Sequence, residues 1–188
     1  MDLRRWVLDD HALVLERLER QVIDHVPPKR WAEHVDGGGT SIGWGLFHAW
    51  YHQDLARTAV AGAPPIIAPW RARLGVGGLA PDVGVGESEV DGVAAALEPD
   101  ALAGYVREVH AAMRSWLESA GPDDFDRVAD GPGALGTAGV TVDAAGWLHA
   151  MWSGKPVAWF VRWEGIGHGH THVGEMVSTR NRMGLSPF

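Results

Sequence analysis

Apolar residues recur every three or four positions in four long stretches of the chain, which is the spacing of one face of an α-helix. The four stretches cover residues 3–26, 42–61, 99–118 and 157–183. Pro27 and Pro28 end the first stretch, and Thr40 and Ser41 are suitable N-caps for the second. Because each helix has one apolar face to bury, we expect an all-α fold. The arrangement expected is a four-helix bundle with a long crossover between helices two and three.

Two connections between these stretches are rich in glycine. The crossover, residues 62–97, also contains several prolines, and a loop of this length in a compact domain is often functional. We expect it to form the mouth of a pocket, with Trp70 and Arg71 as cofactor or substrate contacts, since arginine suits an anionic group. The second connection, 121–142, ends in a β-like run at 140–142 and is followed by a short helix over 144–152.

The length and charge of the chain restrict its function. At 188 residues it is expected to form one domain, residues 1–188. A net charge of −8 without any basic block argues against a nucleic-acid partner. No stretch has the roughly 20 apolar residues of a membrane span, and the first residues lack the apolar core of a signal peptide, so we expect a cytoplasmic protein. The absence of cysteine excludes disulfides, zinc–thiolate sites and cysteine nucleophiles.

Three histidines fall within five positions near the end of the chain. Residues four apart share a helix face, so His168 and His172 point together whereas His170 points away. The same steps add Glu164 and Glu175 to the shared face. Imidazole and carboxylate groups on a core-facing surface cost free energy unless they are paired or bind a metal. This stripe is therefore either a solvated polar face or half of a metal site.

A further histidine lies on the apolar face of the second helix. That face comprises Trp44, Phe47, His48, Tyr51 and Leu55. His48 thus occupies a position where a helical bundle usually has leucine, and it is either a core histidine with a hydrogen-bond partner or a metal ligand. The histidine pair elsewhere in the chain favours the ligand. His52, one turn later with Asp54 beside it, is a weaker candidate.

Glycines interrupt the last helix at positions 165, 167, 169 and 174. Each costs roughly 1 kcal/mol relative to alanine in an exposed helix interior. Such a cost suggests that another helix approaches closely. We expect a two-fold homodimer packed through this region, although packing against helix one or two of the same chain would serve equally well.

The segment Ser41-Ile42-Gly43-Trp44-Gly45-Leu46-Phe47-His48, taken with His168-x-x-x-His172-x-Gly174-Glu175, resembles the DinB superfamily. Relatives in this family include YfiT-like thiol transferases and mycothiol-dependent maleylpyruvate isomerases. The resemblance covers nearly the whole chain. It implies that His48, His168 and His172 hold one divalent metal, zinc or nickel, in a cytoplasmic protein that is frequently a homodimer. Many members have His-x-Gly-Gln where this chain has Glu175, and a glutamate can accept a proton whereas glutamine cannot.

Three neutral imidazoles would leave a metal with an open position, which is the pattern of a catalytic site. Because the chain has no cysteine, the nucleophile would be metal-bound hydroxide or the thiolate of a cofactor such as mycothiol. Glu164 or Glu175 would act as general base or hold a histidine through its second nitrogen. We therefore expect a metal-dependent S-transferase, isomerase or related hydrolase acting on a small electrophile. The alternative is a non-catalytic helical bundle that binds a metal or a small ligand.

Overall fold

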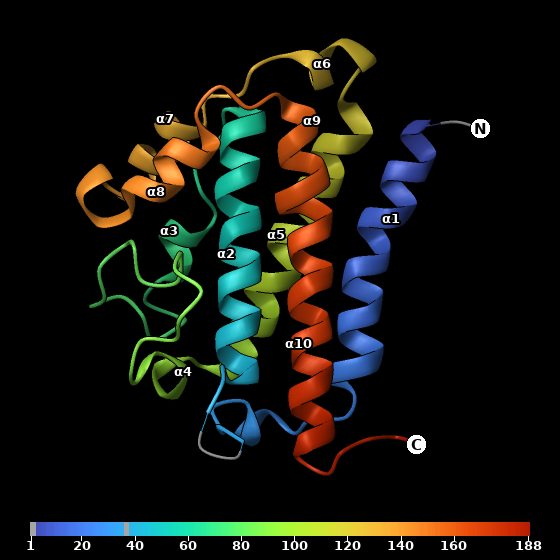
Figure 1. Ribbon diagram of the computed structural model, residues 1–188, viewed down its shortest axis with the longest axis vertical. Coiled ribbons are helices and arrows are strands. Elements are labelled where there is room, and N and C mark those ends of the chain that lie inside the picture. Colours follow the sequence, from blue (N-terminus) through green and yellow to red (C-terminus); the bar gives the residue numbers. More distant parts are fainter. Residues whose placement is uncertain (1–2, 36–37) are drawn as a thin grey trace.

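The computed structural model describes residues 3–35 and 38–188. In these ranges all regular elements are helices, and the only β pairing consists of two isolated bridges. Long helices run side by side along the molecule: α1 (Leu3–Leu18), α2 (Ile42–Ala61), α5 (Pro99–Ser119) and α10 (His168–Arg182) (Figure 1). The expected all-helical fold is confirmed. None of the described helices is long and apolar enough to cross a membrane.

Shorter helices complete the chain. The crossover contains α3 (Ile67–Trp70) and α4 (Val93–Ala96), and the second connection contains α6 (Pro122–Asp126), α7 (Gly131–Thr137) and the start of α8 (Val142–Trp152). The β-like run predicted at 140–142 is wrong, because Thr141 caps α8 by accepting a hydrogen bond from the Ala144 N–H at 3.3 Å. The capping side chain of Thr141 thus starts a helix at Val142, in a run whose composition favours a strand.

Helix α2 lies at the centre of the fold. It contacts α5, α10 and α7, and every residue from Ile42 to Val60 is buried. The largest side chains of the core include Trp44, Trp50, Trp152, Tyr51 and Tyr105. Each polar side chain on a helix with no solvent face needs a hydrogen-bond partner from elsewhere in the protein. This requirement applies to His48, His52 and Asp54, all of which are buried.

Asp54 anchors the beginning of the crossover. Its carboxylate accepts hydrogen bonds from the N–H groups of Ile66 at 2.9 Å and Ile67 at 2.7 Å, and from the Tyr105 hydroxyl at 3.2 Å. Burial raises the pKa of Asp54, although these hydrogen bonds and Arg57 act in the opposite direction. Asp54 therefore serves the structure of the crossover rather than the histidine cluster.

The last long helix changes its winding before it reaches the histidines. Helix α9 (Val157–Phe160) continues as a π-helical segment, η3 (Val161–Gly167), and then as α10. A π segment has more residues per turn than an α-helix and occurs frequently at functional sites. Here it includes Glu164, whose side chain is fully buried, so the change of winding lies beside the first of the two α10 histidines.

The glycines of the last helix face other helices of the same chain. A Cβ atom on Gly169 would lie 2.7 Å from Val14 Cγ1 of α1, and one on Gly165 would lie 3.3 Å from Met113 Cε of α5. A Cβ built on Gly174 has no neighbouring atom within 4 Å among the described residues outside its own helix backbone. Close packing within one chain thus accounts for Gly165 and Gly169, and the homodimer stays a prediction without support from them.

Replacing Gly169 by alanine should lower the free energy of unfolding by about 1–3 kcal/mol, because the added methyl group overlaps the buried Val14 side chain, which must then shift. Gly174→Ala is the matched control. It is exposed on the same helix and should be neutral or stabilising by up to about 1 kcal/mol, since alanine is the better helix former. Urea unfolding measures both. Equal effects of the two substitutions would contradict the close contact between α1 and α10.

Two buried histidines stack where α1 meets α5. The rings of His11 and His110 lie 4.0 Å apart at 10°. Within the described part of the chain, neither ring nitrogen of His11 has a hydrogen-bond partner, nor does Nδ1 of His110. Burial, with smaller contributions from His110 and Arg114, lowers the pKa of His11 to about 3. Burial and Arg114 lower the pKa of His110 to about 4. Both rings are therefore neutral in the folded protein near pH 7.

This pair predicts a loss of stability in mild acid. In the unfolded chain both histidines take up protons below their ordinary pKa of about 6.5, but in the folded chain they do so only near pH 4 and 3. The unfolded state thus binds more protons in this window, and the free energy of unfolding falls as the pH drops from about 6.5 towards 3. In the His11→Leu variant, the free energy of unfolding measured with urea should fall less steeply between pH 7.5 and 5. A His11→Leu curve that runs parallel to that of the wild type would refute the prediction.

Candidate metal centre

Helices α2 and α10 bring three histidines together. The ring of His48 lies 5.0 Å from that of His168 and 4.6 Å from that of His172, and the two α10 rings are 4.4 Å apart. One ring nitrogen from each histidine lies within 4.8 Å of the others, and the two α10 Nε2 atoms are 2.9 Å apart. The predicted grouping of these three residues is thus present in the structure, and it is compatible with metal binding.

Hydrogen bonds on the outer nitrogens fix which ring nitrogen faces the centre. His48 Nδ1 lies 2.7 Å from the Gly84 carbonyl oxygen, so Nδ1 carries the hydrogen and Nε2 keeps its lone pair. His172 Nδ1 lies 2.7 Å from Glu175 Oε2, which has the same effect. Among the described residues, no group bonds the buried Nε2 of His48. The Nε2 atoms of His48 and His172 form a donor set that fits a divalent metal, and the outer partners orient them.

Two histidines of the centre, His48 and His168, are neutral in the folded protein. Burial, aided by the neighbouring His52 and His172, lowers the pKa of His48 to about 3. Burial also lowers the pKa of His168 far below its usual range, with His52 and His172 adding to the effect. Metal binding requires neutral imidazole, so the protein environment favours the binding form throughout the physiological pH range.

Glu164 lies behind His168, on the side away from solvent. Its Oε2 is 3.2 Å from His52 Nδ1 and 3.6 Å from His168 Nδ1, while its Oε1 accepts a hydrogen bond of 2.8 Å from Trp152 Nε1. His52, Glu164 and His168 form a second group of possible ligands, all buried. Glu175, in contrast, is exposed beside His172. The two carboxylates expected near the histidines therefore have different environments.

A segment of the crossover covers the histidine face of α2. Three of its backbone carbonyls accept hydrogen bonds from that face: Pro81 from the Tyr51 hydroxyl at 2.7 Å, Gly84 from His48, and Val85 from His52 Nε2 at 2.9 Å. Positions 48, 51 and 52 share one face of a helix. Their spacing in the sequence therefore indicates that the three side chains meet the same neighbouring segment. The sequence alone does not show which carbonyls those side chains bind.

An open cavity of about 400 Å³ adjoins the histidines. Two tryptophans form part of its wall, and the remaining lining is largely hydroxyl-bearing or charged. These lining residues are Trp44, Trp163, Thr40, Thr171, Ser178, Thr179, Glu87, Glu175 and Arg182, together with Gly39, His168 and His172. The crossover contributes Glu87. The cavity thus gives a small polar molecule access to His168 and His172.

The structure does not bring Trp70 and Arg71 to this cavity. Trp70 donates to Glu108 of α5 at 3.1 Å, and the Arg73 guanidinium lies 3.8 Å above its ring. Arg71 donates to the carbonyls of Val76, at 3.1 Å, and Leu79. Trp70 thus attaches the crossover to α5, whereas Arg71 bonds within the crossover. They lie earlier in the crossover than the segment that covers the histidines, a distinction that composition does not reveal.

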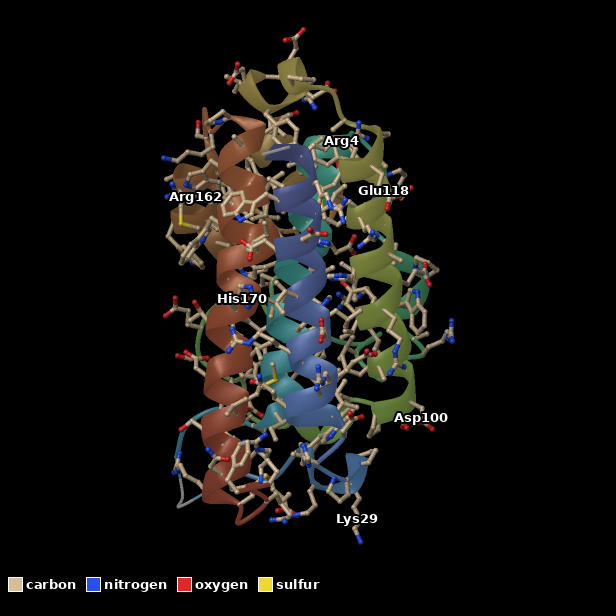
Figure 2. All side chains as sticks on the ribbon, turned by 90° about the vertical axis from the view of Figure 1, so that its right-hand side faces the viewer. Arg4, Lys29, Asp100, Glu118, Arg162 and His170 are labelled. Carbon is tan, nitrogen blue, oxygen red and sulfur yellow. The ribbon has the colours of Figure 1, made fainter. Side chains whose placement is uncertain are left out.

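His170 lies outside the centre, as the helical spacing predicts. Its Nδ1 is 3.2 Å from a guanidinium nitrogen of Arg17, and Figure 2 shows it on the side of α10 that is next to α1. Its pKa is lowered, first by burial and then by Arg17. It therefore offers a control residue close to the centre that does not take part in it.

Comparison with known families agrees with this site. The model of the DinB superfamily matches residues 11–176, a range that includes all three histidines. The chain belongs to the DinB superfamily. A comparison with curated protein sequences finds no significant match.

Proposed function

We propose that the protein is a metal-dependent enzyme with the four-helix bundle and long crossover of its family. His48, His168 and His172 would hold one zinc or nickel ion. The substrate class proposed is a small electrophile, with a low-molecular-weight thiol of the mycothiol type as co-substrate for S-transfer or isomerisation, or water for a related hydrolysis. The observation that carries this proposal is the set of three imidazoles that converge beside an open cavity.

The bound ion would acidify a thiol or water in its open position. The chain's own residues then have separate tasks. Glu175 holds His172 by Nδ1 and lines the cavity, so it is placed to accept a proton from the incoming nucleophile. Glu164 is buried behind His168 and does not line the cavity, which suits it to orienting that ring. Trp44 and Trp163 provide flat apolar surfaces for the electrophile.

The test is turnover by untagged protein that has been stripped and reloaded with zinc or nickel. A hydrophilic thiol and an activated electrophile are supplied, and thiol consumption is followed. We expect turnover that depends on the metal, is lost in His172→Ala and is kept in His170→Ala. Hydrolysis without thiol would select the hydrolase. Tight binding of metal without turnover of any thiol or ester substrate would contradict the enzyme and favour a non-catalytic binding protein.

A further inference from the structure

A second cavity, of about 760 Å³, lies between α1 and α10 and shares no lining residue with the cavity beside the histidines. Figure 2 faces this side of the molecule, where α1 runs beside the last helix. The lining comes from α1, from η1 (Glu19–Ile23), which is the π-helical segment that continues α1, from α10, and from Pro187 and Phe188. The cavity is therefore a candidate site of its own.

The charged lining of this cavity is mainly basic. Arg17 comes from α1, Arg20 from η1 and Arg180 from α10. Glu16 is the one carboxylate side chain among the described lining residues, and it is paired with Arg20, whose Nη1 lies 2.9 Å from Glu16 Oε1. Arg17 and Arg180 thus add two positive charges to a cavity of a chain whose net charge is −8.

The charge of Arg180 has no counter-charge within the protein. The side chain is buried, with a relative exposure of 4%. Its Nε and Nη2 donate to the side-chain oxygen of Asn181 at 3.2 and 2.7 Å, and its Nη1 donates to the Gln21 carbonyl. Both acceptors are neutral, and in the described part of the chain no carboxylate forms an ion pair with Arg180.

A buried guanidinium without a counter-charge costs free energy, and arginine does not remove this cost by losing its proton. The carbonyl end of α10 offsets part of the cost, because Arg180 lies in the last turn of that helix. Partial charges of this kind leave the full positive charge at the cavity wall. An anion in the cavity would supply the missing counter-charge.

Arg17 offers a second guanidinium to the same cavity. Its Nη1 lies 3.2 Å from His170 Nδ1, and no carboxylate among the described residues forms an ion pair with it. Apolar surface lies beside the two arginines, from the exposed side chains of Leu13 and Phe188 and from the half-buried Val177. Guanidinium groups recognise carboxylates and phosphates, and apolar walls hold the body of an organic ligand.

We propose that the cavity between α1 and α10 is a binding site for a small amphiphilic anion, with a carboxylate or phosphate monoester as head group and an apolar body. The head group pairs with Arg17 and Arg180, and the body lies against Leu13 and Val177. Arginine has five N–H groups, and Arg180 makes three hydrogen bonds within the described structure, so two N–H groups remain for a ligand. The site is separate from the metal centre and does not depend on the proposed function.

Calorimetric titration of the wild-type protein tests the ligand class with four probes: octanoate, octyl phosphate, inorganic phosphate and 1-octanol. We expect octanoate or octyl phosphate to bind at least about tenfold more tightly than inorganic phosphate and 1-octanol, because neither of these two offers both a charge and an apolar chain. The tighter of the two anionic amphiphiles identifies the head group. Absence of binding by both, or equal binding of inorganic phosphate, would overturn the proposal.

Asn181→Asp separates a ligand site from a purely structural arginine. The new carboxylate would replace the amide that Arg180 contacts twice, so it would pair the positive charge within the protein. We expect the tighter of octanoate and octyl phosphate to bind about 10–100-fold more weakly, with the free energy of unfolding unchanged or raised. Binding as tight as in the wild type would overturn the proposal, because Arg180 would then only join α10 to α1.

Arg17→Gln should weaken the same probe about tenfold, since it removes the second guanidinium. Arg162→Gln is the matched control. It changes the net charge equally, but Arg162 is exposed on η3 and does not line the cavity (Figure 2). Equal effects of the two substitutions would contradict a local site.

Phosphatidylcholine vesicles with and without phosphatidic acid distinguish a free ligand from a membrane lipid as the source of the anion. Sedimentation with the phosphatidic acid vesicles that is lost in Arg17→Gln and Asn181→Asp would support the site and identify a lipid as its ligand. No sedimentation, together with binding of a soluble probe, would support a free amphiphile. Sedimentation that is the same in both variants and the wild type, without binding of octanoate or octyl phosphate, would overturn the proposal.

Discussion

Alanine at His168 or His172 is expected to reduce zinc affinity by more than about 100-fold, which exceeds the 10–100-fold typical of losing an outer partner of a metal ligand. Each substitution removes one of three nitrogens that lie within 4.8 Å of one another. Two imidazoles alone do not provide the three protein ligands of a catalytic zinc site. His48→Ala should have the same effect, although it also leaves the Gly84 carbonyl without its partner.

His170→Ala is the matched control for this series. It lies between the two ligands in sequence, on the same helix, but its side chain contacts Arg17 of α1. Elemental analysis and chelator competition should give unchanged zinc content and affinity for this variant. Equal loss of zinc from His170→Ala and His172→Ala would mean that the helical phase of the site is wrong. Retention of zinc by all the variants would refute the three-histidine centre.

The pairing of His168 with His172 was predictable because it depends only on helical geometry. A spacing of four residues places two side chains on one face whatever the tertiary fold, and the π segment ends at Gly167, just before the first of them. His48 was predictable for a related reason, since a polar residue on an apolar stripe needs a partner. The helices themselves followed from the same periodicity, which is why their positions agree well with the pattern.

The outer partners of the histidines were not predictable, because they depend on how the crossover folds. Carbonyl groups are present at every residue and carry no side-chain signal, so the sequence could not indicate Gly84 or Val85. Trp70 and Arg71 were predicted to contact a ligand on the basis of side-chain chemistry alone. In the structure Trp70 bonds to α5, and Arg71 bonds within the crossover. The partnership of His52 with Glu164 joins α2 to the π segment, and helical spacing within one element does not reveal it.

Gly84 is the position where the fold of the crossover and the metal centre depend most directly on each other. Its φ of +103° lies in a region that residues with a side chain rarely adopt, and a Cβ atom there would lie 2.5 Å from Phe47 Cε1. Phe47 is buried beside His48 and cannot move into solvent. Alanine at this position must therefore displace the backbone, and with it the carbonyl that His48 Nδ1 contacts.

We expect Gly84→Ala to lower the free energy of unfolding by about 2–4 kcal/mol, the combined scale of backbone strain and overpacking, and to weaken zinc binding about 10–100-fold. Gly86→Ala is the matched control. It lies two residues away in the same loop, its φ is not left-handed, and a Cβ there meets no atom of the described residues within 4 Å. Urea unfolding and chelator competition measure the two effects separately. A destabilised Gly84→Ala protein that binds zinc as tightly as the wild type would show that the Gly84 carbonyl does not orient His48.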